Sequence, residues 1–146
     1  MVIVFWWQGE YRRMRNILFR GKDTVTGEWV YGDLIHRIVW TKPMYIIRTF
    51  DNGFDIYKDY DVYPESVAQF TGLHDKNDKK IFEGDIFTNE KGDIGRVTWY
   101  DEYSAFMIFS ITKNKVYWLY DNDFSMLLYI GNIHDNPELL KEGAEG

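Results

Sequence analysis

The chain has 146 residues with 17 basic and 23 acidic side chains, a formal charge of −6 and no cysteine. The absence of cysteine excludes a disulfide framework, a thiolate nucleophile and a thiolate metal site, and the spread acidic charge disfavours a dedicated duplex-DNA binder. This length suits one domain, or one domain with a small satellite lobe, whose core needs no metal or disulfide to hold it.

The first thirteen residues differ from the rest of the chain. Their apolar run at residues 2–7 is far shorter than the roughly 20 residues of a membrane-spanning helix. It also lacks the basic lead-in and the cleavage site of a signal peptide. We therefore expect a cytoplasmic protein with no membrane partner. Residues 1–13 are either a mis-assigned start, with Met14 as the true initiator, or a native extension whose aromatic residues dock on the core or on a partner.

The late-start interpretation predicts that a chain beginning at Met14 folds as well as the full-length chain. The apolar residues before Met14 would then contribute nothing to the core, so their removal should leave the melting temperature unchanged. Thermal denaturation of the two chains, followed by circular dichroism, makes the comparison. A large loss of thermal stability would show instead that the segment packs against the fold.

From Asn16 onward, short apolar runs alternate with turn signals. Strands are expected at residues 16–20, 28–36 and 44–50, with a bend at Gly32 in the second. The sequence Asp51-Asn52-Gly53 is the strongest hairpin signal, because Asn-Gly tolerates both positive φ angles of a two-residue type I′ turn. Residues 44–50 should therefore pair with residues 54–57.

The second half of the chain continues this pattern. Pro64 fits the first position of a single helical turn, and Asn136-Pro137 reads as the cap and start of another. A charged turn at residues 75–79 separates two strands of a hairpin. Residues 96–100 alternate as a half-buried strand with Val97 and Trp99 on one face. Further strands are expected at 105–109, 116–120 and 125–133, followed by a frayed tail at 141–146.

Four segments resemble the YopX family of phage and prophage proteins. The most specific are QFTGLHDKNDKKIFEGD at residues 69–85 and GNIHDNPEL at residues 131–139, and residues 15–22 and 27–35 match as well. One departure is Asp78, where the family often has Gly. The resemblance covers about residues 14–140 and implies a phage genomic setting. It implies no activity, because the family has none established.

The expected fold class is all-β, because aromatic residues make up 18% of the chain and no stretch keeps helical periodicity over three turns. The resemblance adds a mixed β-architecture with an N-terminal β lobe at about residues 14–82. A part similar to an SH3-like barrel follows at about residues 83–133, and one or two single-turn helices complete the fold.

No motif for catalysis, a cofactor or a metal is present. The three histidines His36, His74 and His134 lie far apart without zinc-binding spacing, and we interpret them as surface or capping residues. No nucleophile elbow and no glycine-rich phosphate loop occurs. The sequence therefore predicts a protein that is not an enzyme and that has no cofactor.

Acidic residues gather between Asp51 and Glu65, where only Lys58 opposes them. Oxygen ligands suit Ca²⁺ or Mg²⁺, but the spacing does not match an EF-hand loop. We interpret the cluster as a solvated acidic edge, since charge on an edge strand discourages association between sheets. A DNA-mimic surface that occupies a host protein is the functional alternative.

Aromatic residues gather between residues 99 and 120, and most of them should fill the core. SH3-like barrels also bind ligands in an aromatic-lined groove with an acidic rim. The sequence Tyr100-Asp101-Glu102-Tyr103 could form such a rim, so these four residues are the candidate partner-binding site. Nearby cations are few for a single-stranded nucleic acid site, which needs Lys or Arg beside the rings.

The preferred function is a non-enzymatic phage accessory protein that binds a host or phage protein. The alternatives are a nucleic-acid-associated regulator that uses the SH3-like part, and a DNA mimic that inhibits a host protein. Homo-oligomerisation through edge strands stays open.

Overall fold

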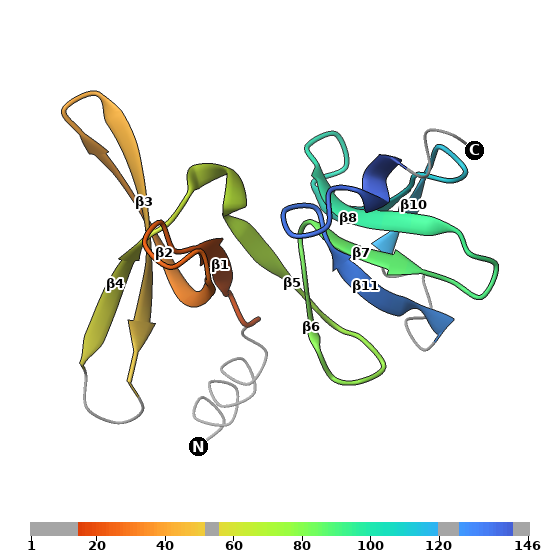
Figure 1. Ribbon diagram of the computed structural model, residues 1–146, viewed down its shortest axis with the longest axis horizontal. Coiled ribbons are helices and arrows are strands. Elements are labelled where there is room, and N and C mark those ends of the chain that lie inside the picture. The colour runs from red at the N-terminus through yellow and green to blue at the C-terminus, as the bar shows by residue number, and fades with distance from the viewer. Residues whose placement is uncertain (1–14, 52–55, 120–125, 142–146) are drawn as a thin grey trace, which may run out of the picture.

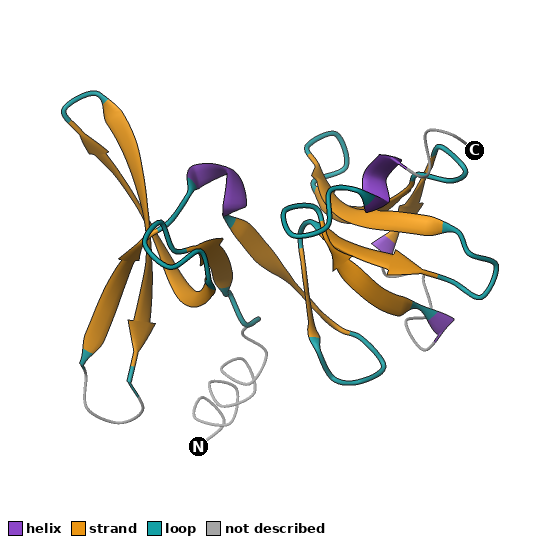
Figure 2. Cartoon of the chain, in the orientation of Figure 1, coloured by secondary structure: helices purple, strands orange, loops and turns teal. Residues whose placement is uncertain are grey.

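The computed structural model describes residues 15–51, 56–119 and 126–141. Two antiparallel sheets make up this part of the chain, which confirms the all-β fold class (Figures 1 and 2). The six-stranded sheet has the order β4-β3-β2-β1-β5-β6, and the five-stranded sheet has the order β10-β9-β8-β7-β11.

The strands of the six-stranded sheet are β1 (Phe19–Lys22), β2 (Trp29–Val39), β3 (Lys42–Phe50), β4 (Tyr57–Asp61), β5 (Ala68–His74) and β6 (Lys80–Phe82). The long strand β2 pairs with two different strands. Its first four residues pair with β1, and residues 33–39 pair with β3. The predicted helical turn at Pro64 is confirmed as η1 (Pro64–Ser66), with Pro at its start.

The strands of the five-stranded sheet are β7 (Asp85–Thr88), β8 (Ile94–Tyr100), β9 (Ala105–Ser110), β10 (Lys115–Trp118) and β11 (Leu128–Asn132). A short helical turn follows, where Leu139 N–H donates to the Asn136 carbonyl, as the cap signal predicts. The described strands form an open sheet with β10 and β11 at its edges. The SH3-like barrel is therefore not confirmed.

The two sheets are linked through β5 and β6. Figure 1 shows β5 running from the first sheet toward the second. Strand β6 pairs with β5, yet its Ile81 is buried in the core beneath the second sheet, together with Phe87, Val97, Ile108 and Leu119. The turn between β5 and β6 contains Asp78 at φ 61°, a left-handed conformation that explains why Gly also suits this position.

One predicted hairpin is wrong in register. Strand β3 does pair with the next strand, but the pairs run from Phe50 with Tyr57 to Ile46 with Asp61. The Asp51 N–H donates to the Ile56 carbonyl at 2.9 Å, which continues the same register beyond Phe50 and Tyr57. The Asn52-Gly53 pair falls in this connection, at residues 52–55, which lie outside the described residues.

Candidate functional site

The candidate partner-binding residues lie at the turn between β8 and β9. The Tyr103 N–H donates to the Tyr100 carbonyl and the Ser104 N–H to the Asp101 carbonyl, both at 3.2 Å. Ser104 has φ 48°, and this left-handed residue closes the turn. The turn fixes Tyr100 and Tyr103 at the end of the sheet.

Three aromatic side chains meet beside this turn. The ring centroids of Tyr100 and Tyr103 are 6.3 Å apart, and Tyr103 contacts Trp118 of β10 edge to face at 5.4 Å. Tyr103 is 46% exposed and Trp118 is 37% exposed. We call Tyr100, Tyr103 and Trp118 the aromatic cluster. It presents contiguous aromatic surface next to β10, which is an edge strand.

The acidic residues of the turn play different roles. Asp101 accepts a hydrogen bond from the Trp99 indole N–H at 2.7 Å, whereas Glu102 is exposed. Trp99 shares the face of Val97, as predicted, but lies at the end of the sheet and is 42% exposed. The structure therefore brings Tyr100 and Tyr103 together with Trp118. The sequence alone did not single out Trp118, because its place depends on the register between β9 and β10.

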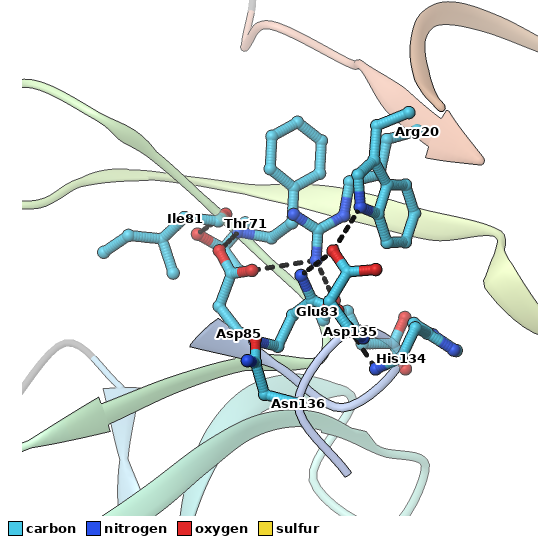
Figure 3. Close-up of polar contacts among 11 residues, drawn as sticks. Arg20, Thr71, Ile81, Glu83, Asp85, His134, Asp135 and Asn136 are labelled. Atoms are coloured by element: carbon cyan, nitrogen blue, oxygen red, sulfur yellow. Dashed lines mark hydrogen bonds and ion pairs between the residues drawn. The ribbon is translucent and has the colours of Figure 1, made fainter. Parts of the chain in front are cut away.

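A second candidate site lies where the two sheets meet, around Arg20 of β1 (Figure 3). Arg20 Nη2 donates to Asp85 Oδ1 at 2.8 Å and to the Glu83 carbonyl at 3.3 Å. The side chains of Arg20 and Asp85 are only 4% and 1% exposed. The guanidinium lies 4.5 Å from the ring centroid of Trp29 and 4.7 Å from that of Phe82. Two aromatic rings therefore lie within cation–π distance of the guanidinium.

Asp85 connects this ion pair to the backbone of β6. Its Oδ2 accepts the Phe82 N–H at 2.8 Å. Burial raises the pKa of the Asp85 carboxyl, and Arg20 opposes that shift. Removal of either charge would leave the other buried without a partner, so the pair ties β1 of the first sheet to β7 of the second.

The loop after β11 completes this site through Asp135. Asp135 accepts the Trp29 indole N–H and the Asn132 side-chain amide, at 2.8 and 2.9 Å, and pairs with the ammonium of Lys22. Partial burial alone would raise the pKa of Asp135, but these hydrogen bonds together hold it well below its usual range. His134 packs edge to face on Trp29, with ring centroids 5.7 Å apart.

The charge state of His134 should make the fold sensitive to mild acid. Burial lowers the pKa of His134, and nearby Arg20 and Lys22 lower it further. Between the two pKa values, His134 binds more protons in the unfolded chain than in the folded chain. The contribution of neutral His134 to the free energy of unfolding is therefore complete above the unfolded pKa of about 6.5, and it is lost as the pH falls through the lower folded pKa. His134→Gln should flatten the dependence of melting temperature on pH across that window. Parallel profiles for the two proteins would contradict the assignment.

A cleft of about 500 Å³ opens beside Arg20. Its lining residues come from both sheets and from the loop after β11: Leu18, Arg20, Trp29, Tyr31, Lys79, Lys80, Phe82, Tyr129, Asn132 and Asp135. Sequence reasoning did not single out this cleft. The available signal was that each segment resembling the YopX family supplies at least one residue to it.

The remaining polar candidates do not form a site. Within the described residues, no group of three or more His, Asp or Glu side chains could hold a metal ion. His36 stacks on Tyr45 with centroids 4.6 Å apart, and His74 packs edge to face on Phe70. In the same part of the chain, no helix is long and apolar enough to cross a membrane.

The acidic segment is partly neutralised. Arg48 donates to both carboxylate oxygens of Asp59, at 2.7 and 2.9 Å. This hydrogen bonding lowers the pKa of Asp59. Glu65 belongs to η1 rather than to β4, and Asp55 lies outside the described residues. The ion pair reduces the uncompensated charge that a DNA-mimic surface would need.

Comparison with known proteins agrees with the fold. The crystal structure of protein EF1440 from Enterococcus faecalis is similar, with a TM-score of 0.50 and 22% sequence identity, over 87% of this chain and 99% of that chain. None of the curated proteins compared with the chain matches it. The sequence model of the family described as YopX protein matches residues 18–141. That match contains every residue that lines the cleft beside Arg20 and nearly every described residue, and the chain therefore belongs to the YopX family.

Proposed function

We propose that this YopX-family chain is a non-enzymatic phage or prophage accessory protein that binds a host or phage protein in the cytoplasm. The observation that carries the proposal is the aromatic cluster at the edge of the second sheet, where Tyr103 and Trp118 are exposed and in contact with each other. Aromatic side chains dominate binding energy at protein interfaces, because they bury large rigid surfaces. The exposed rings of Tyr103 and Trp118 are therefore well suited to anchor a partner.

The surroundings of the aromatic cluster favour an extended and basic segment of the partner. Asp101 and Glu102 lie in the same turn and would attract Lys or Arg. Strand β10 is at the edge of the sheet, so an extended backbone could pair with it while its side chains contact the rings.

Nucleic acid is a weaker match to this surface. Single-stranded nucleic acid needs cations beside the stacking rings. Lys113 instead pairs with Asp93 at 3.1 Å, and the Arg96 guanidinium packs 5.6 Å from the ring centroid of Phe109. These contacts favour the protein-binding function over the regulator that binds nucleic acid through the second sheet.

A displayed library of random peptides tests the proposal. We expect the protein to select extended peptides that carry Lys or Arg, and the affinity of one such peptide is then measured by fluorescence anisotropy. Tyr103→Ala with Trp118→Ala should weaken its binding by about 30-fold or more, because truncation of an aromatic anchor costs about 2 kcal/mol or more.

The matched control is Phe50→Ala, because Phe50 is an exposed aromatic residue on the first sheet. This control should bind like the unaltered protein. Selection of no basic peptide, or equal losses in the control and in the double variant, would refute the proposal.

A further inference from the structure

The cleft beside Arg20 concentrates positive charge in an acidic protein. Lys79 and Lys80 come from the turn and strand that follow β5, and Arg20 comes from β1. Lys79 Nζ lies 3.2 Å from the ring centroid of Tyr129, at the wall of the cleft. The formal charge of the chain is −6, so this local excess of cations is not a property of the surface as a whole.

Arg20 is only partly satisfied by the protein. Its Nη2 is bonded to Asp85 and to the Glu83 carbonyl, and the ring centroids of Trp29 and Phe82 lie 4.5 and 4.7 Å from the guanidinium. Its Nε is buried and has no hydrogen-bond partner among the described residues. A buried donor without an acceptor is costly, since desolvation is not repaid. An anionic oxygen in the cleft would supply the missing acceptor.

Tyr31 adds a polar hydroxyl and an accessible ring to the same cleft. It is 47% exposed and packs edge to face on Phe82, with centroids 5.5 Å apart. Burial raises the pKa of its hydroxyl, while the nearby Arg20 opposes that shift. The hydroxyl therefore stays protonated and can donate a hydrogen bond to an anion, and the exposed ring can stack on a planar group.

Asn132, at the end of β11, and Asp135, in the loop that follows, also line the cleft. Their side-chain oxygens already accept hydrogen bonds within the protein, so these residues hold the wall of the cleft in place. A cavity of about 500 Å³ lies within the usual range of small-ligand sites. Cations and an accessible ring thus meet in one space of ligand size.

From these observations we propose that the cleft between the two sheets binds a nucleoside phosphate. The phosphate lies against Arg20, Lys79 and Lys80, and the base lies against Tyr31. The ligand is either a free nucleotide or a nucleotide unit of a single strand, since both present the same chemistry. This site is separate from the aromatic cluster, so it stands or falls independently of the proposed protein-binding function.

The test is a titration of the ¹⁵N-labelled full-length protein with adenosine 5′-monophosphate, followed by NMR. The indole N–H signal of Trp29, assigned with Trp29→Phe, and the amide signals of Lys79 and Lys80 should shift and saturate. Adenosine and inorganic phosphate are titrated separately and should bind at least about tenfold more weakly, because each lacks half of the contacts.

A charge-reversal pair tests the cations. Lys79→Glu with Lys80→Glu changes two exposed residues and should weaken binding by about tenfold or more. The matched control, Lys76→Glu with Lys91→Glu, makes the same change in net charge at exposed residues outside the cleft. It should alter the affinity by no more than about twofold, because distant exposed charges are screened.

Two further probes identify the source of the ligand. Tighter binding of a short oligothymidylate than of the mononucleotide supports a single strand, and weaker binding supports a free nucleotide. The proposal is overturned by the absence of saturable shifts up to about 5 mM nucleotide. Equal affinity for inorganic phosphate, equal losses in the two charge-reversal pairs, or tighter binding of an oligoglutamate peptide would also overturn it.

Discussion

Asp85→Ala should lower the free energy of unfolding by about 3–5 kcal/mol, the usual cost of removing one partner of a buried ion pair. The variant leaves the Arg20 guanidinium buried without its carboxylate, and it also removes the acceptor of the Phe82 N–H. Because Arg20 and Asp85 belong to different sheets, the contact between the sheets should weaken first. Urea denaturation gives the free energy, and amide exchange at β1 and β7 reports the contact.

The matched control is Asp59→Ala, which removes the exposed ion pair with Arg48. Exposed pairs contribute roughly 0–1 kcal/mol, so this variant should be nearly as stable as the unaltered protein. Arg20→Met with Asp85→Leu removes both charges and should be more stable than Asp85→Ala alone, since no uncompensated charge stays buried. Similar stability of Asp85→Ala and Asp59→Ala would contradict a structural role for the buried pair.

Much of the secondary structure could be predicted because it depends on local chemistry. Pro64 starts a helical turn and Asn136 caps another, and both signals depend on only a few neighbouring residues. The hairpin connection at residues 52–55 shows the limit of this reasoning. Asn-Gly favours a two-residue turn, but cross-strand pairs from Phe50 with Tyr57 onward set a different register.

The contacts of the aromatic cluster could be predicted only in part for a similar reason. Tyr100 and Tyr103 are neighbours in sequence, so a turn could be expected to bring them together. Trp118 joins them because β9 and β10 pair with Trp118 opposite Met107, and such a register cannot be read from one strand. The predicted SH3-like closure likewise depends on pairing between distant strands, and the described strands form an open sheet.

The site around Arg20 was hardest to anticipate, because it depends on burial of charge. Arg and Asp are almost never fully buried unless they are paired, and the sequence analysis did not single out Arg20 or Asp85. The indole N–H of Trp29 and the carboxylate of Asp135 are likewise partners from distant segments. Family resemblance was the informative signal, since its most specific segments converge on this interior contact rather than on an exposed surface.

Gly32→Ala should lower the free energy of unfolding by about 3 kcal/mol, because the added methyl group has no space in a packed sheet. A Cβ on Gly32 would lie 2.0 Å from the carbonyl oxygen of Arg48. Gly32 stands where β2 changes partner, since it pairs with Phe19 of β1 while Asp33 pairs with Arg48 of β3. The backbone of β3 would have to move away, and hydrogen bonds on both sides of the switch would weaken. Urea denaturation measures the loss.

Gly27→Ala is the control for Gly32→Ala, because it adds the same methyl group with nothing within 4 Å. Gly27 has φ 73°, so alanine there costs only about 1–2 kcal/mol of backbone strain. The difference in free energy of unfolding between the two variants separates the cost of the clash with the β3 backbone from the cost of an unfavourable backbone conformation. Equal losses of free energy of unfolding would mean that the β3 backbone can move away from the added methyl group without destabilising the sheet. A larger loss at Gly32 would establish that glycine permits β2 to serve both halves of the first sheet.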